Sequence, residues 1–261
     1  MTDFSSYFSL RVARTQTEIE RLQHLRWEVY CREFHYEREE DCLNEREADL
    51  FDGSAMHVYA EHRSSGLLAG TVRIVCADAL EDGLSLPLEQ AYSAQAQPLD
   101  LGGGPRNHLI EISRLAVSAS FRRRSGEGLS PIGLNVLMDP DEMSIMERSL
   151  PLLPLALYLS VAAIVDVRGV HEALGYAMMQ PRLVRLLKRF GIQFQQAGPP
   201  IDYHGERAAY RITLDEVVAG LDNQMRTLYE SLVETIGADL PCPTVSPGSI
   251  CVPFSSMASK N

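Results

Sequence analysis

The alternation of apolar and polar positions in the N-terminal part of the chain predicts one helix followed by a β-hairpin. Thr17 to Glu20 has the Thr-x-x-Glu spacing of a capping box, so a helix is expected to begin near Thr17. Apolar residues then recur at helical spacing on one face: Ile19, Leu22, Leu25, Val29 and Tyr30. Residues 57–61 and 67–75 read as strands joined by a turn at 63–66. The acidic stretch 38–52 between the helix and the hairpin is predicted to be an exposed loop.

The rest of the chain alternates between strand and helix patterns. The elements expected after the hairpin are a loop with a short helix at 77–106, a strand at 108–117, a buried helix at 152–167, a helix at 180–190, strands at 192–196 and 208–214, and a long amphipathic helix from Leu214 to Ile236. Residues 125–149 read as a long mobile loop, and the tail from Pro241 as poorly ordered. This order predicts an α/β or α+β sandwich, divided into a main domain at 1–213 and a C-terminal extension at 214–261.

Composition narrows the class of protein. The 261 residues are 45% hydrophobic and carry a formal net charge of −11, which excludes a mostly disordered or multi-span membrane chain and argues against general nucleic-acid binding. The apolar run 150–165 contains two prolines and is too short for a membrane span, so it predicts a buried helix. The N-terminus lacks the pattern of a signal peptide. A cytoplasmic location is therefore expected.

The five cysteines are odd in number and irregularly spaced, at positions 31, 42, 76, 242 and 251. No C-x-x-C pair occurs, so reduced thiols and no metal site are expected. The G-x-G-x-x-G, P-loop and G-x-S-x-G patterns are also absent, which removes the main support for a dinucleotide, phosphate-loop or α/β-hydrolase site.

Arg26 falls inside the apolar stripe of the first predicted helix. Charged side chains are seldom buried unless they are paired, so Arg26 either extends to the helix edge or faces a cleft and meets carboxylates. Asp49 and Asp52 are candidate partners, because Leu50 and Phe51 between them indicate that this part of the acidic loop packs onto the protein.

Glu111 and Arg114 lie in a strand that is otherwise apolar, and both therefore need partners. They form either a structural ion pair across a sheet or part of an active site. Positions three apart point to opposite faces of a regular strand, so a β-bulge between them would be required to bring the two side chains together.

Two basic clusters interrupt this acidic chain: Arg122, Arg123 and Arg124, and then Arg182, Arg185, Lys188 and Arg189. Ordinary solvation of a helix face is one explanation of the second cluster. Against the overall negative charge, a docking patch for an anionic partner is favoured.

Four short motifs occur in an order that resembles the acyl-homoserine lactone synthases and the related N-acyl amino acid synthases. They are Arg26-x-x-x-Tyr30, Glu47-x-Asp49-x-x-Asp52, Arg73 at the end of Gly70-Thr-Val-Arg73, and Glu111-x-Ser113-Arg114. The segment 175–195, followed by 201–207, resembles the acyltransferases associated with PEP-CTERM/exosortase systems. The resemblance covers residues 8 to 215.

The resemblance implies a GNAT-like fold, with a central mixed sheet flanked by helices. It also implies transfer of an acyl group from the 4'-phosphopantetheine thioester of acyl carrier protein to a small amine, with no bound cofactor and no cysteine nucleophile. It makes Glu111 the general base, acting directly or through water. Asp49 and Asp52 would hold the acceptor ammonium or position Arg26 and Arg73, and Arg114 would fix Glu111 or bind an acceptor carboxylate.

Tyr30, Ser113, Arg26 and Arg73 complete the implied substrate-binding set, and both basic clusters would meet the acidic carrier. The predicted helix 152–167 would line the acyl-chain pocket or simply belong to the core.

Two departures from the family pattern bear on the product. Tyr30 stands where the family often has Phe, and the following aromatic is Tyr36 instead of Trp. These differences argue mildly against a homoserine-lactone product and favour an N-acyl amino acid synthase. The alternatives are an acyl-homoserine lactone synthase that uses S-adenosylmethionine, and a non-catalytic module that binds acyl carrier protein. The sequence leaves open the acyl length, the acceptor, and whether helix 214–236 packs on its own core or on a second subunit.

Overall fold

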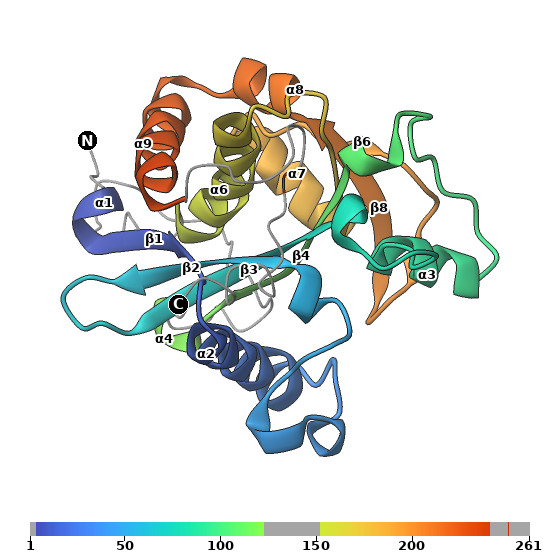
Figure 1. Cartoon of the computed structure of the whole chain (residues 1–261), viewed down its shortest axis with the longest axis horizontal. Helices are drawn as coiled ribbons and strands as arrows, with labels where there is room; N and C mark the ends of the chain where they lie inside the picture. Colours follow the sequence, from blue (N-terminus) through green and yellow to red (C-terminus); the bar gives the residue numbers. More distant parts are fainter. Residues whose placement is uncertain (1–3, 123–151, 241–249, 251–261) are drawn as a thin grey trace.

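One mixed β-sheet with helices on both faces forms the body of the protein (Figure 1). The computed structural model describes residues 4–122, 152–240 and 250. Their helices are α1 (Phe4–Tyr7), α2 (Gln16–Trp27), α3 (Pro87–Ala94), α4 (Ala119–Arg122), α6 (Leu152–Arg168), α7 (Pro181–Arg189), α8 (Leu214–Gly220) and α9 (Asn223–Asp239). The strands are β1 (Phe8–Val12), β2 (Met56–His62), β3 (Leu68–Cys76), β4 (Leu109–Val117), β5 (Leu174–Met179), β6 (Gln195–Gln196), β7 (Ile201–Asp202) and β8 (Glu206–Thr213). The predicted mixed sheet flanked by helices is confirmed.

The strand order is β1-β2-β3-β4-β5-β8-β6, with β7 paired to β8. Neighbouring strands are antiparallel except β4 and β5, which are parallel. The β4–β5 pairing covers Leu109 to Glu111 on one strand and Leu174 to Tyr176 on the other. Beyond these residues, β4 continues to Val117 and β5 to Met179, and the two strands no longer pair with each other. Glu111 therefore lies where the two central strands stop sharing hydrogen bonds.

A β-bulge interrupts the pairing of β3 with β4 just beyond Glu111. Arg73 faces Ser113 and Thr71 faces Ala116, so β4 uses one more residue than β3 over this interval. Arg114 within the bulge has φ of 52°, in the left-handed region that non-glycine residues rarely adopt. The bulge that the Glu111–Arg114 spacing required is present.

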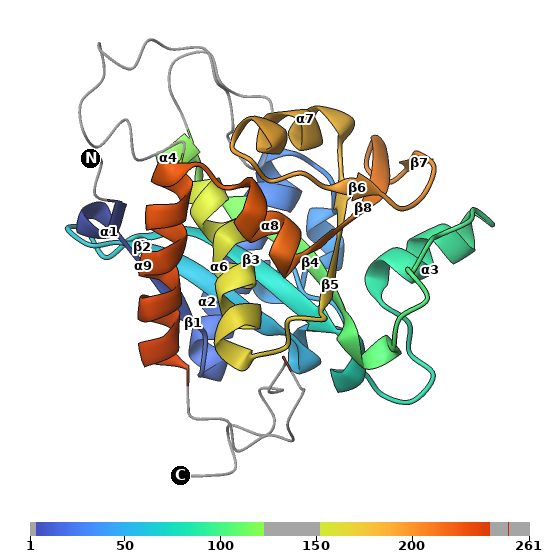
Figure 2. The ribbon, with the colours of Figure 1, turned by 90° about the horizontal axis from the view of Figure 1, so that it is seen from above.

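Helix α6 lies on one face of the sheet with α9 beside it, and α2 covers the opposite face (Figures 1 and 2). Nearly all residues of α6 from Leu152 to Val165 are buried, because the helix is apolar all round. The predicted buried helix is confirmed. Among the described residues, no helix combines the length and apolar character needed to cross a membrane.

The first helix begins two residues earlier than its pattern indicated. Thr15, not Thr17, is the N-cap: its Oγ1 accepts from the Glu18 N–H at 3.2 Å, and the Glu18 carboxylate accepts from the Thr15 N–H at 2.9 Å. Two Thr-x-x-Glu frames overlap in this segment. The Thr15 frame prevails because Glu18 also accepts from Tyr59 Oη at 2.9 Å, a contact that only the folded sheet provides.

The long helix expected after Leu214 is divided into α8 and α9, so that prediction is wrong in its continuity. The backbones of Gly191 and Gly220 approach so closely that a Cβ on Gly220 would lie 2.0 Å from the Gly191 carbonyl oxygen. A new N-cap then starts α9, where the Asp222 carboxylate accepts from the Met225 N–H at 2.8 Å. Helix α9 buries Met225 and Ile236 against α6 and β1 of its own chain. The division of the chain at residue 214 stays a prediction.

The cysteines differ from their predicted state at one position. Cys76, at the end of β3, is disulfide-bonded, so the expectation of five reduced thiols is wrong there. Cys31 and Cys42 are free, with their sulfurs 3.2 Å apart. Chain spacing gave no sign of which sulfurs the fold brings together. The predicted loop 125–149 lies outside the described residues, as does the predicted tail apart from Ile250.

Candidate active site

Three arginines and three carboxylates from distant parts of the chain meet in one buried network. We call it the charge cluster, and its members are Arg26 on α2, Glu47, Asp49 and Asp52 in the loop before β2, Arg73 on β3 and Arg114 on β4. The three positive and three negative formal charges balance, and each carboxylate pairs with a guanidinium group of the same cluster. Of the two alternatives for Arg26, pairing with carboxylates is the one present, although Arg26 does not line the cavity next to the charge cluster.

Arg26 is held by two acids at once. Its two terminal nitrogens donate to the two oxygens of Asp52 at 2.8 and 2.7 Å, and its Nε lies 2.6 Å from Glu47 Oε2. Only 1% of Arg26 is exposed, and a planar guanidinium with a bidentate carboxylate is the geometry that suits such burial. Leu50 and Phe51 behave differently from each other: Phe51 is buried and brings Asp52 inward, whereas Leu50 stays exposed.

Arg73 and Arg114 complete the network from the sheet. Arg73 Nη1 donates to Asp49 at 2.5 Å and to Asp52 at 3.0 Å, and Arg73 Nε donates to Ser113 Oγ at 3.1 Å. Arg114 donates from Nε to Glu47 at 2.9 Å and from Nη2 to Asp49 at 3.2 Å. The unusual backbone of Arg114 thus aims its side chain at the acids of the opposite loop.

Asp49 and Asp52 of the charge cluster are ionised and paired with arginines. Burial alone would raise the pKa of Asp52, but the charges and hydrogen bonds of Arg26, with the charge of Arg73, hold it well below its usual range. Asp49 behaves in the same way toward Arg73 and Arg114. Burial and the charge of Arg26 lower the pKa of the adjacent His57 to about 4, so this imidazole is neutral. None of these groups is poised to accept a proton near neutral pH.

A cavity next to the charge cluster is lined by polar and aromatic side chains. We call it the polar pocket. Its two adjoining lobes share Tyr30, Tyr36, Ser113, Arg114 and Arg207, and Glu111, Glu37, Tyr203 and His204 line one of them. Arg26, Arg73, Asp49 and Asp52 do not line either lobe. The predicted site residues therefore separate into a buried network and a smaller group that reaches the cavity.

Glu111 is the buried acid of the polar pocket. Its side chain is 3% exposed, and Oε2 accepts from the Leu88 N–H at 2.8 Å. Burial raises the pKa of Glu111 to about 7, although that hydrogen bond and the charge of Arg73 act against the rise. A carboxyl group with this pKa can take up a proton near neutral pH, as a general base must. Carboxyl groups with strongly raised pKa values concentrate at functional sites.

Tyr30 reaches the polar pocket from a π-helical turn over Glu28–Glu33, a departure from α-helix that often marks functional sites. Its hydroxyl donates to the Leu115 carbonyl at 2.7 Å, and burial raises its pKa to about 12. Tyr30 therefore stays protonated. It ties the end of α2 to the bulged strand β4.

The sequence analysis gave no site role to Glu37, Tyr203 or Arg207, which line the polar pocket, although the last two lie in the segment 201–207 that carries the resemblance. His204 also lines this cavity: its ring stacks on Tyr36 at 5.6 Å and its Nε2 lies 3.5 Å from Glu37. All but Glu37 come from the tight β7–β8 connection, more than 85 positions after Glu111. Only a motif that combined both segments could have grouped these residues.

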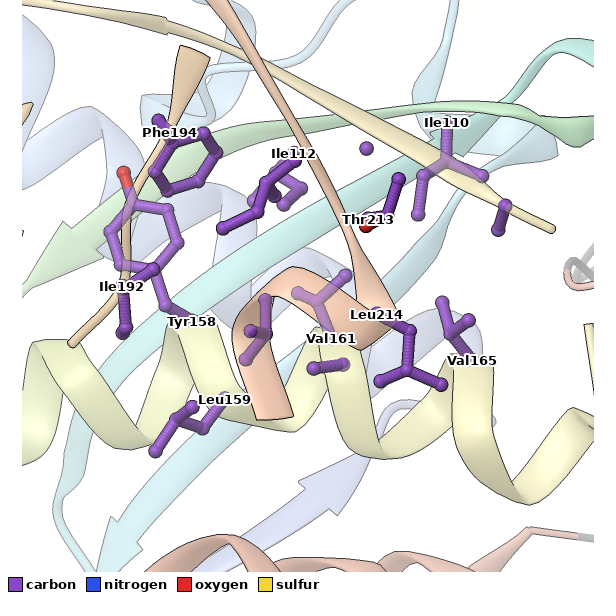
Figure 3. A pocket seen from close by; sticks show the side chains of 15 residues that line it. Ile110, Ile112, Tyr158, Leu159, Val161, Val165, Ile192, Phe194, Thr213 and Leu214 are labelled. Carbon is purple, nitrogen blue, oxygen red and sulfur yellow. The ribbon is translucent and has the colours of Figure 1, made fainter. Parts of the chain in front are cut away.

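A second, apolar cavity lies between the sheet and α6 (Figure 3). We call it the apolar pocket, and its walls include Ile110, Ile112, Tyr158, Val161 and Phe194. Ile112 and Tyr158 also line the polar pocket, so these two side chains form a common wall between the cavities. One of the two outcomes expected for α6, that it borders a pocket, is present. Most of the helix also belongs to the core.

The two basic clusters have different fates. Arg122 is buried, where it pairs with Glu33, lies over the Phe34 ring at 4.9 Å and donates to the Val117 carbonyl. The expectation that it contributes to an exposed docking patch is wrong, because the fold supplies it with internal partners. Arg123 and Arg124 lie outside the described residues. On α7, Arg182, Arg185, Lys188 and Arg189 are exposed.

Residues 25–130 match the family model of the acetyltransferase (GNAT) domain. This range contains the whole charge cluster and Glu111. Several solved structures are similar to the chain, including the following three. The AHL synthase LasI is 15% identical over 83% of this chain and 97% of its own, with a TM-score of 0.53. TofI, solved with an inhibitor and MTA, is 18% identical over 83% and 99%, with a TM-score of 0.52. The CoA-dependent acyl-homoserine lactone synthase BjaI, solved with SAM and isopentyl-CoA, is 15% identical over 87% and 90%, with a TM-score of 0.53.

The fold is GNAT-like. At these identities the structural matches establish the fold alone, and no curated protein matches the sequence. In the described part of the chain, no group of three or more His, Cys, Asp or Glu side chains is placed to hold a metal ion. The acids of the charge cluster face arginines instead.

Proposed function

We propose that this protein is an acyltransferase that moves a fatty acyl group from the thioester of acyl carrier protein to the amine of an amino acid or a similar small acceptor. The observation that carries the proposal is Glu111, a buried carboxyl with a pKa of about 7 in a polar pocket that shares a wall with an apolar pocket. One cavity suits the acceptor and the other suits the acyl chain.

In the proposed reaction, Glu111 takes a proton from the acceptor ammonium, directly or through a water molecule. The neutral amine attacks the thioester carbonyl, the carbon–sulfur bond breaks, and the pantetheine thiolate leaves and takes up a proton. The developing oxyanion would be stabilised by backbone N–H groups of β4 beyond Glu111, where that strand no longer pairs with β5. Tyr30 and Ser113 would shape the acceptor side of the cavity.

In this proposal, the charge cluster positions the site and does not contact the substrate. Arg26, Arg73, Asp49 and Asp52 pair with one another and do not line the cavity, so they fix the loop before β2 against the sheet. Arg114 connects the cluster to the polar pocket, and both of its bonded edges face carboxylates. These residues position the site and do not act on the substrate.

In this proposal, the acyl donor docks on the basic face of α7, which carries Arg182, Arg185, Lys188 and Arg189. Acyl carrier protein is acidic, and the exposed Arg185 and Arg189 offer charges that would attract it over a distance set by ionic strength. A cytoplasmic location stays a prediction from the sequence, and a link to an exosortase/PEP-CTERM system accompanies the proposal through the sequence resemblance. Replacing Arg185 and Arg189 by Glu should weaken carrier binding, most strongly at low salt, and equal binding at all salt concentrations would remove this docking surface.

An acyl-homoserine lactone synthase is the second candidate, and the similarity in fold to LasI and BjaI favours it. Such an enzyme would acylate the amine of S-adenosylmethionine and close a lactone with release of methylthioadenosine. The same base and the same two cavities would serve it. A non-catalytic module that binds acyl carrier protein is the third candidate.

One assay separates the three. The purified protein is incubated with acyl carrier protein or CoA thioesters of several chain lengths, each with a panel of amino acids or with S-adenosylmethionine, and products are read by mass spectrometry. N-acyl amino acids support the proposal, and a lactone with methylthioadenosine supports the second candidate. Carrier binding without any product leaves the binding module and overturns the proposed activity.

A further inference from the structure

The polar pocket contains a guanidinium group that the charge cluster does not neutralise. Arg207, at the start of β8, lines both lobes of the pocket and has no ion pair within the part of the chain that the structure describes. Its Nε is buried and has no hydrogen-bond partner among these residues. A buried donor without a partner is costly, so such a group is expected to meet one when a ligand is bound.

Arg114, the other arginine of the pocket, is already occupied. Its Nε and Nη2 donate to Glu47 and Asp49, and those two acids hold it at the edge of the charge cluster. Arg114 thus already has two carboxylate partners in the charge cluster, whereas Arg207 has none among the described residues. Glu37, the other acid of the cavity besides Glu111, lies 3.5 Å from His204 and forms no ion pair with Arg207. Arg207 is thus the cation that remains free to take an anionic ligand.

Two aromatic rings fix the orientation of Arg207. Its guanidinium carbon lies 5.1 Å from the centre of the Tyr36 ring and 6.0 Å from that of Tyr203. Contacts of this kind engage the faces of the guanidinium and leave its edges, which carry the N–H donors. A planar fork of donors held in this way matches a carboxylate.

We propose that Arg207 binds the carboxylate of the acceptor, and that this contact makes the enzyme select α-amino acids over amines that lack a carboxylate. The inference rests on the proposed function for its reaction. It adds that a substrate ammonium group lies toward Glu111 while the carboxylate on the same molecule lies against Arg207, since both side chains line one cavity.

The test uses acceptor pairs that differ only in the carboxylate: leucine with isopentylamine, and phenylalanine with phenethylamine. For each pair, kcat/KM is measured with one acyl thioester for the wild-type protein, Arg207→Gln and Arg207→Lys. Arg211→Gln is the matched control, because it removes the same charge from the same strand at a residue that pairs with Asp100 and lines neither lobe. Thermal unfolding confirms that each variant is folded.

The wild-type protein should prefer the amino acid of each pair by about ten- to a hundredfold, the factor expected for a hydrogen-bonded charge pair. Arg207→Gln should remove this preference by lowering only the amino-acid rate, Arg207→Lys should restore part of it, and Arg211→Gln should leave it intact. A wild-type protein without the preference, or Arg207→Gln with the full preference, overturns the inference.

A binding measurement keeps the inference testable if no acceptor is turned over. N-acyl leucine and the matching N-isopentyl amide are titrated into the wild-type protein and Arg207→Gln by calorimetry. Tighter binding of the carboxylate product by the wild-type protein alone supports the role of Arg207 even if the proposed activity fails. Equal binding of the two products, or binding of neither, overturns it.

Discussion

The charge cluster and the polar pocket are neighbours that use the same residue types for opposite purposes. In the cluster, Arg26 and Asp52 are joined by two hydrogen bonds, and Asp49 and Asp52 have pKa values below their usual range. In the pocket, Glu111 has a raised pKa and Arg207 has a buried Nε without a partner. The paired charges of the cluster stabilise the fold around the site, whereas Glu111 and Arg207, which form no ion pair within the described part of the chain, are available to a substrate.

Arg114 marks the boundary between these two regions. Its guanidinium belongs to the cluster and its side chain lines the pocket. The β-bulge that sets its position also follows Glu111 by three residues. Through Arg114, the charge cluster therefore holds the loop before β2 next to the polar pocket. In the proposed reaction the cluster does not contact the substrate.

Glu111→Gln is expected to have the largest effect, and it tests the pocket side of the comparison. The amide cannot accept a proton, so acyl transfer should fall by about a hundred- to ten-thousandfold, as for other general bases. The change preserves shape and removes a carboxyl that burial disfavours, so thermal unfolding should show a folded protein. Initial rates with saturating thioester measure the loss, and unchanged turnover would take the base role away from Glu111.

Asp52→Asn tests the cluster side. The change leaves the buried charges of Arg26 and Arg73 without their shared counter-ion, which should lower the free energy of unfolding by about 3–5 kcal/mol. Asp41→Asn, at an exposed acid of the same loop, is the control and should change it by about 0.5 kcal/mol or less. Urea unfolding curves give both values. Equal midpoints for the two variants would show that the cluster does not support the fold.

Arg114→Lys tests whether Arg114 acts only within the charge cluster or also binds the acceptor. An ammonium group cannot reproduce the two bonds that Arg114 directs to Glu47 and Asp49, so the protein should lose about 1–3 kcal/mol of unfolding free energy. The preference for leucine over isopentylamine should not change, because that preference is assigned to Arg207. A loss of preference in this variant would place the carboxylate at Arg114 instead.

The pH profile gives the smallest and most specific signal. Glu111 acts as a base only when it is deprotonated, and its raised pKa places this change near pH 7. The rate should rise about tenfold per pH unit below pH 7 and then level off. Acceptors whose amine pKa values differ provide the control. A break that moves with the acceptor belongs to the amine and not to Glu111.

Local patterns predicted most of the elements. Alternation located the hairpin, and apolar runs located β4 and α6, because these patterns depend on one buried face or on burial all round. Element ends were less reliable. The helix cap moved to Thr15 because Glu18 also meets Tyr59 on the sheet, and the last helix was broken where Gly191 and Gly220 come together. Both differences depend on contacts between segments far apart in the chain.

The sequence by itself determined which charged residues stand at apolar positions: an arginine within an apolar stripe, acids beside Leu50 and Phe51, and Glu111 and Arg114 in a buried strand. Only the tertiary structure decided how these groups combine. The pairing of β3 with β4 and the bulge at Arg114 select which charges neutralise one another, and the β7–β8 connection brings Arg207 to the cavity that contains Glu111. Burial gives those pairings their strength, since a charge in the interior is stable only with a partner within bonding distance, and that distance is a property of the fold.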